Sequence, residues 1–137
     1  MGIRAANMSN PVDIAVSGLK AENLRLKVTA SNIANARTSR TDSGAAYRRK
    51  FVVLETGGKG LGGVKIDEIA QDMTSEFRKV LMPGHEDADE QGYVLMPNVD
   101  LPVEMTEMVM ASRAYQANAA VLKRYQEMVD MTIELLR

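Results

Sequence analysis

The C-terminal stretch Asp100–Arg137, DLPVEMTEMVMASRAYQANAAVLKRYQEMVDMTIELLR, has the hydrophobic periodicity of one long helix. Two stripes of mostly apolar residues run along it, each with alternating steps of four and three residues, which is the period of helices that pack on other helices. The first stripe consists of Leu101, Met105, Met108, Ser112, Tyr115, Ala119, Leu122, Gln126, Val129, Ile133 and Leu136. The second stripe consists of Met110, Ala114, Ala117, Val121, Arg124, Met128, Met131 and Leu135.

The two stripes lie on nearly opposite sides of the predicted helix, because an offset of two positions corresponds to about 200°. One partner helix cannot cover both, so we predict that this helix lies between neighbours. The helix would span about 55 Å, whereas a compact globule of this chain length has a diameter of about 37 Å. We therefore expect it to extend beyond its own subunit. We expect the first stripe, which includes the polar Gln126, to face the chain's own N-terminal helix.

A second helix is predicted near the N-terminus, from Val12 to Asn35. Asn10 or Ser9 can cap it, and Pro11 suits the first helical position. Its apolar residues also form two rows, one of Ala15, Leu19, Leu26, Ala30 and Ile33 and the other of Ile14, Ala21, Leu24 and Val28. Gly18 interrupts the helix at a cost of about 1 kcal/mol relative to alanine. A tolerated glycine is the simplest interpretation, and a conformational or close-packing role is the alternative.

The segment between the two helices has the composition of loops and short strands. A polar loop is predicted over residues 37–46, a glycine loop over 57–63 and a turn at Pro83-Gly84. Strands are predicted over residues 47–56, 64–70, 76–82 and 92–96. The fold class is therefore α+β, with long terminal helices packed as a coiled-coil-like pair and a small central β region. We expect three parts, an N-terminal helix in 1–36, the β region in 37–99 and the C-terminal helix in 100–137.

Composition excludes several classes of protein. The 137 residues carry 17 basic and 18 acidic side chains, a net charge of -1, so nothing in the charge balance favours nucleic acid. The chain has no cysteine, which excludes disulfides and cysteine-based metal sites. No apolar run approaches the roughly 20 residues of a membrane span, and the N-terminus lacks the pattern of a secretory signal. We expect a protein that is cytosolic or leaves the cytosol without a cleaved signal.

The motifs that resemble catalytic or binding sites are weak. Gly58–Gly63 contains a formal G-x-G-x-x-G, but the following VKIDEI predicts a strand where a dinucleotide site needs a helix. Asp87–Gly92 resembles the start of a calcium loop, but Asn98 stands where the bidentate glutamate belongs. A single histidine, His85, cannot form a histidine-based catalytic or zinc site alone. We therefore predict no enzymatic activity, no metal, no cofactor and no small-molecule substrate.

Charged and amide side chains give less specific signals. The basic run Arg48–Lys50 can contact a neighbouring subunit or anionic lipid, or it can be a solvated strand edge. Amides cluster on the two helices at Asn32, Asn35, Gln116, Asn118 and Gln126. Buried amides fix register in helical assemblies, whereas the alternative is surface amides or, for Asn35, a helix C-cap.

Several short motifs resemble those of the flagellar rod and hook axial proteins. Residues 17–21 (SGLKA) and 30–38 (ASNIANART) are similar to the N-terminal signature of that family, and residues 112–118 (SRAYQAN) to its C-terminal signature. Residues 47–50 (YRRK) and 92–100 (GYVLMPNVD) are more specific and resemble the proximal rod subtype. The match covers nearly the whole chain in the same order.

This resemblance implies a structural subunit of the proximal rod in the flagellar basal body, in the periplasm. It implies export by the flagellar type III apparatus and polymerisation through the terminal helices into a hollow, torque-transmitting shaft. The implied partners are other copies of the chain, other rod proteins and the basal-body adaptor protein, with no nucleic acid. The competing interpretation is a soluble helical export chaperone or adaptor, which would bury one stripe in a dimer and offer the other to a client.

We expect the assembly interface to combine apolar residues of both helices with their amides and one arginine. Its predicted members are Leu19, Leu26, Asn32, Ile33, Asn35, Met108, Arg113, Tyr115, Asn118, Val121, Leu122, Gln126, Val129 and Leu136.

Overall fold

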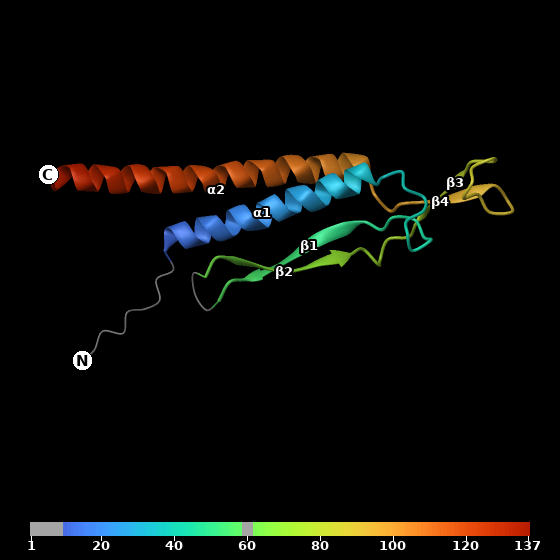
Figure 1. Ribbon diagram of the computed structural model, residues 1–137, viewed down its shortest axis with the longest axis horizontal. Helices are drawn as coiled ribbons and strands as arrows, with labels where there is room; N and C mark the ends of the chain where they lie inside the picture. The colour runs from blue at the N-terminus through green and yellow to red at the C-terminus, as the bar shows by residue number, and fades with distance from the viewer. Residues whose placement is uncertain (1–9, 59–61) are drawn as a thin grey trace.

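The structure is a computed structural model that describes residues 10–58 and 62–137 (Figure 1). Its elements in chain order are α1 (Pro11–Ala34), β1 (Lys50–Thr56), β2 (Val64–Gln71), β3 (Arg78–Leu81), β4 (Tyr93–Met96) and α2 (Leu101–Leu135). The α+β fold class is confirmed, with two long terminal helices and short antiparallel strands between them. Residues 59–61 of the predicted glycine loop, and the possible cap Ser9, lie outside the described residues.

Local sequence signals set the ends of both helices. The side chain of Asn10 accepts a hydrogen bond from the backbone N–H two residues later, and Pro11 occupies the first helical position. Asp100 caps α2 in the same way through the N–H three residues later. Asn35 ends α1, and its side-chain amide donates to the carbonyl oxygen four residues back at 2.8 Å. Each cap satisfies a backbone group that the helix itself leaves unpaired.

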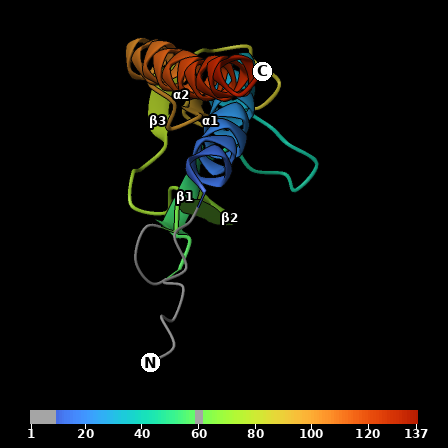
Figure 2. The same ribbon diagram turned by 90° about the vertical axis from the view of Figure 1, so that its left-hand side faces the viewer.

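The helix α1 lies between two layers, with α2 on one side and the β1–β2 hairpin on the other (Figures 1 and 2). Leu24 and Val28 of α1 line the same hollow as Ile69 of β2. On another face, Arg25 and Asn32 hydrogen-bond to side chains of α2. This position between two layers explains why the sequence of α1 carries more than one apolar row.

The strands form two separate hairpins. β1 pairs antiparallel with β2, from Lys50↔Gln71 to Thr56↔Val64, with a register shift between Val53 and Leu54. β3 pairs antiparallel with β4 and lies beyond the end of the helix pair at which α1 ends and α2 begins (Figure 1). β1 starts three residues later than predicted because the preceding backbone bonds elsewhere. The N–H of Tyr47 donates to Thr38, and that of Arg49 donates to the side chain of Asn98.

The helix α2 extends well past α1. The two helices run antiparallel, and their register is fixed where Asn32 bonds Glu104 and where Gly18 faces Asn118. If this register is continued along the two helices, Pro11, the first residue of α1, lies level with about Tyr125. All residues from 126 to 137 are exposed, which corresponds to an overhang of about 16 Å (Figure 1).

The face of α2 that packs on α1 only partly follows the first stripe. Leu101, Met108 and Leu122 of that stripe are partly buried. The most buried residues, however, are Glu104 and Ala111, each at 1% exposure and each one position before a member of the stripe. The pattern of apolar residues does not reveal this face, because Glu104, one of its most buried members, is charged.

The position of Gln126 differs most clearly from the prediction that the first stripe faces the chain's own N-terminal helix. It is exposed and lies beyond the level at which α1 starts. The prediction that Gln126 sits in the seam between the chain's own helices is therefore wrong. The apolar period of α2 continues past the point where α1 can cover it, so periodicity alone does not show where the intramolecular contact stops.

The overhang gives a testable consequence. In the isolated chain, we expect the backbone amides of residues 126–135 to exchange hydrogen about 100-fold faster than those of 104–111, because only the latter are packed against α1. Hydrogen exchange followed by mass spectrometry measures both segments in one sample. Equal protection along the whole of α2 would contradict this prediction.

Candidate functional site

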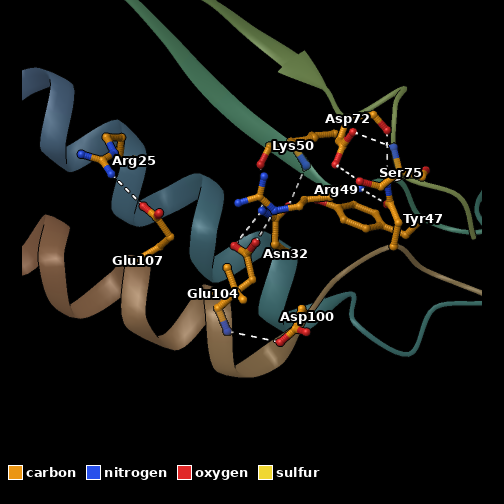
Figure 3. A network of polar contacts seen from close by, with 12 residues as sticks. Arg25, Asn32, Tyr47, Arg49, Lys50, Asp72, Ser75, Asp100, Glu104 and Glu107 are labelled. Carbon is orange, nitrogen blue, oxygen red and sulfur yellow. Dashed lines mark hydrogen bonds and ion pairs between the residues drawn. The ribbon is translucent and has the colours of Figure 1, made fainter. Parts of the chain in front are cut away.

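Asn32 connects the helix pair to the β region (Figure 3). It is 1% exposed, and its amide nitrogen donates to the carbonyl of Lys50 at 2.8 Å and to Glu104 Oε2 at 2.9 Å. Its amide oxygen accepts from the N–H of Lys50 and from the hydroxyl of Tyr47, each at 3.0 Å. Two donors and two acceptor positions are all that an amide side chain has. Asn32 is therefore fully occupied within its own subunit.

Glu104 forms a buried ion pair at the same place. Its side chain is 1% exposed, and its Oε1 accepts from Nε of Arg49, while Oε2 accepts from Asn32. The pair joins α2 to the residue that precedes β1 (Figure 3). A buried carboxylate is costly without compensation, and here both oxygens have a charged or polar donor. We call Asn32, Tyr47, Arg49 and Glu104 the polar junction.

The basic run Arg48–Lys50 is mostly engaged inside the molecule. Arg48 donates to the carbonyl of Asp72 at 2.8 Å, and its guanidinium lies 4.3 Å from the ring centre of Phe77. Arg49 belongs to the polar junction. Arg48 and Arg49 thus have partners within their own subunit.

The turn after β2, at residues 72–75, hydrogen-bonds to side chains near the start of β1 and near the end of β4. The carboxylate of Asp72 accepts four hydrogen bonds, from the hydroxyls and backbone N–H groups of Thr74 and Ser75, at 2.7 to 3.0 Å. The hydrogen bond from the Ser75 hydroxyl, followed by that from Thr74, holds the pKa of Asp72 well below its usual range. The turn presents its backbone carbonyls to Arg48 and to Asn98.

Ser17 and Gly18 explain part of the N-terminal signature. The Ser17 hydroxyl accepts from the N–H of Val64 at 3.0 Å, which ties the start of β2 to α1. A Cβ at Gly63, whose φ is +73°, would meet this hydroxyl. A Cβ at Gly18 would lie 2.7 Å from the amide nitrogen of Asn118. Gly18 thus lies where the two helices approach closely, which favours the close-packing interpretation.

The predicted interface residues fall into three groups. Asn32 and Asn35 bond within the subunit, so their side chains belong to its internal structure. Partly buried members are Leu19, Leu26, Ile33, Met108, Asn118 and Leu122. Exposed members are Arg113, Tyr115, Val121, Gln126, Val129 and Leu136.

The second stripe of α2 is its largest uncovered apolar feature. Among its members, Met110, Val121, Met128, Met131 and Leu135 are all exposed, the last at 88%. They lie beside the face that packs on α1, because Met110 stands one position, about 100° around the helix, before the buried Ala111. A mostly apolar stripe over some 25 residues, interrupted only by Arg124, is unusual on a monomer and typical of a protein–protein contact.

Sequence reasoning missed two members of the polar junction, Arg49 as the partner of a buried carboxylate and Glu104 altogether. A signal for Glu104 was present, because it stands three residues after Leu101 and four before Met108, a position where the helical period calls for an apolar side chain. A charged residue at such a position indicates a buried pair. Its partner lies 55 residues away in the chain and has no comparable signal.

The acidic turn and the other weak motifs also have internal roles. Asp87 accepts from Ser39 at 2.7 Å and from Arg40 at 3.2 Å, and Asp89 accepts from two backbone N–H groups of its own turn. Within residues 10–58 and 62–137, three or more His, Asp or Glu side chains nowhere gather as metal ligands would. None of the helices in this part of the chain is long and apolar enough to span a membrane.

Family comparisons cover both helices. The family model described as "Flagella basal body rod protein" matches residues 13–40. The model described as "Flagellar basal body rod FlgEFG protein C-terminal" matches residues 90–135. The first match includes Ser17, Gly18 and Asn32, and the second includes Glu104 and the exposed stripe.

Whole-chain comparisons give a more specific result. The chain is 42% identical over 132 residues to the flagellar basal-body rod protein FlgC of Yersinia enterocolitica, which covers 94% of this chain and 98% of the relative. It is 43% identical to FlgC of Salmonella typhimurium, with 92% and 96% covered, and 32% identical to FlgC of Bacillus subtilis, with 90% and 95% covered. These relatives are rod proteins, and the comparisons give no support to an export chaperone. The chain belongs to the FlgC family of flagellar basal-body rod proteins.

Proposed function

We propose that this rod subunit polymerises through the second stripe of α2, which packs against neighbouring subunits in the wall of the rod. The observation that carries the proposal is the exposure of most of that stripe, from Met110 to Leu135. Apolar burial contributes about 25 cal/mol per Å² removed from water, so a stripe of this length is a large source of association energy. The first stripe supplies a second contact where it passes the start of α1.

The internal structure of the subunit suits this role. A shaft that transmits torque needs subunits whose helices hold a fixed register. The polar junction and the Gly18–Asn118 contact fix that register at two points of the pair. The family, as its members are named, makes basal-body rods, so the partners are further copies and other rod proteins.

The finer assignments extend this proposal. We place the subunit in the periplasmic, proximal section of a hollow rod, next to the basal-body adaptor protein. It reaches that place through the flagellar type III export apparatus. Support comes from the match to the FlgC family and from the sequence motifs of the proximal rod subtype.

The test of the proposal is Val121→Asp, a change in the middle of the exposed stripe. We expect loss of swimming and loss of the subunit from isolated basal bodies, because assembly would bury an unpaired carboxylate. The free energy of unfolding of the isolated chain should change by less than about 0.5 kcal/mol, since Val121 is 49% exposed. Swimming assays and immunoblots of purified basal bodies, in a strain of the source bacterium without its native copy, give the readouts.

Lys123→Asp is the matched control. It introduces the same side chain two positions later, about 200° around the helix, where the native side chain is 80% exposed. We expect swimming close to that of the native chain. Normal basal bodies with Val121→Asp would show that the second stripe is not an assembly surface.

A further inference from the structure

We propose that the overhanging end of α2, residues 126–136, docks into a groove on α1 of a second copy of this chain. The groove lies between α1, β2 and α2 and has a volume of about 480 Å³. Its apolar lining consists of Val16, Leu19, Leu24, Ile66 and Tyr115. This inference rests on the proposed function and names the surface and the partner of one subunit contact.

Charge around the groove is of one sign. The charged residues that line it are Lys20 and Lys27, both exposed and neither in an ion pair within the described part of the chain. Asn23 stands between them on the same face. The groove therefore favours an apolar segment with acidic flanks.

The overhang of α2 has this character. Its exposed apolar residues include Met128, Met131 and Leu135. Glu127, Asp130 and Glu134 form an acidic strip beside them. Within the described residues, the only ion-pair contact of this strip is one at 4.0 Å between Glu127 and Lys123.

The spacing of the charges matches on the two surfaces. Lys20 and Lys27 are seven residues apart, and so are Glu127 and Glu134. Seven helical residues span about 10.5 Å and return to nearly the same face. Both pairs can therefore form together, whereas an unmatched spacing would allow only one.

Direction and register follow from the fold. α1 and α2 are antiparallel, so an overhang from a copy shifted along the helices runs antiparallel to the α1 that receives it (Figure 1). Glu134 then faces Lys20 and Glu127 faces Lys27, which places Met131 opposite Asn23. Lys20 is level with about residue 116 of its own α2, so the shift between copies is about 18 residues, or about 27 Å.

This contact is heterologous, because one copy offers its overhang and the other its groove. Such contacts extend without closing on a dimer and generate helical polymers. A second copy is therefore an occupant that suits both the chemistry of the groove and the family to which the chain belongs.

The native chain has no cysteine, so a disulfide between two introduced cysteines identifies a single contact. We would express two variants together, Asn23→Cys and Met131→Cys, in the source bacterium without its native copy, and oxidise isolated basal bodies. The expected result is a disulfide-linked dimer that contains one chain of each variant. Because each chain carries one cysteine, this dimer cannot arise within a subunit.

The matched control replaces Met131→Cys with Ile133→Cys, which is equally part of the overhang but points about 200° away. We expect at least about fivefold less dimer with it. Lys20→Glu with Lys27→Glu in the groove variant should lower the dimer yield about tenfold. Glu127→Lys with Glu134→Lys in the overhang variant should restore it.

The outcomes separate the two proposals. Incorporation of both variants into basal bodies without the Asn23–Met131 dimer would overturn the docking inference and leave the proposed function standing, with another rod protein or another segment in the groove. Equal dimer yields with Met131→Cys and Ile133→Cys would overturn it as well. Absence of the native chain from basal bodies would overturn both proposals.

Discussion

Replacing Glu104 with alanine is expected to lower the free energy of unfolding of the isolated chain by about 3–5 kcal/mol. Glu104 is 1% exposed and holds the guanidinium of Arg49 and the amide of Asn32. Without Glu104, the Arg49 guanidinium, whose side chain is only 25% exposed, and the buried amide of Asn32 both lose a partner. Urea unfolding followed by circular dichroism measures the change.

Glu107→Ala is the control for this prediction. Glu107 lies three residues further along α2 and pairs with Arg25 at 2.8 Å, but its side chain is 38% exposed. An ion pair with this degree of exposure contributes at most about 1 kcal/mol. Equal destabilisation by the two variants would show that the buried position of Glu104 has no special weight.

The helices were predictable from the sequence because their signals are local. Asn10 and Asp100 precede prolines or apolar periods and cap the helices through N–H groups two or three residues away. The 3.5-residue period over residues 101–136 requires a helix of that length whatever covers it. The strands were located less closely. β1 begins three residues later than predicted because the N–H of Arg49 bonds the side chain of Asn98, and β3 occupies only Arg78–Leu81 of the predicted 76–82.

The polar junction could not be predicted in the same way. Its contacts join residues 15 to 72 positions apart, such as Asn32 with Tyr47 and with Glu104. Both the amide of Asn32 and the run Arg48–Lys50 stood out in the sequence, but their pattern also fits contacts with neighbouring subunits. Only the fold shows that these groups satisfy one another.

The assembly surface is an intermediate case. The presence of two stripes on α2 was visible in the sequence, whereas the choice between them was not. The buried Glu104 places the intramolecular face one position before the first stripe. The start of α1 at Pro11 determines that Gln126 and all later residues are exposed. The identity of the covered face therefore depends on one buried charge and on the length of a different helix.

Replacing Asn32 with leucine is the second change for which we expect a large effect, a loss of about 4 kcal/mol in the free energy of unfolding. Leucine has a similar size but no polar atoms, so the N–H and carbonyl of Lys50, the hydroxyl of Tyr47 and one oxygen of Glu104 lose their partner. Each buried polar group left without a partner costs about 1–3 kcal/mol. Asn23→Leu on the exposed face of the same helix should change the value by less than about 0.5 kcal/mol.

Combining the two changes tests whether the polar junction acts as one unit. If Asn32 and Glu104 stabilise the subunit through their shared hydrogen bond and shared partners, Asn32→Leu with Glu104→Ala should cost at least about 1 kcal/mol less than the two separate losses together. The second substitution then removes groups that the first has already left unpaired. Strict additivity in urea unfolding would instead mean that Asn32 holds β1 and Glu104 holds Arg49 independently. In that case the register of the helices would depend on their other contacts, such as Gly18 with Asn118 and Arg25 with Glu107.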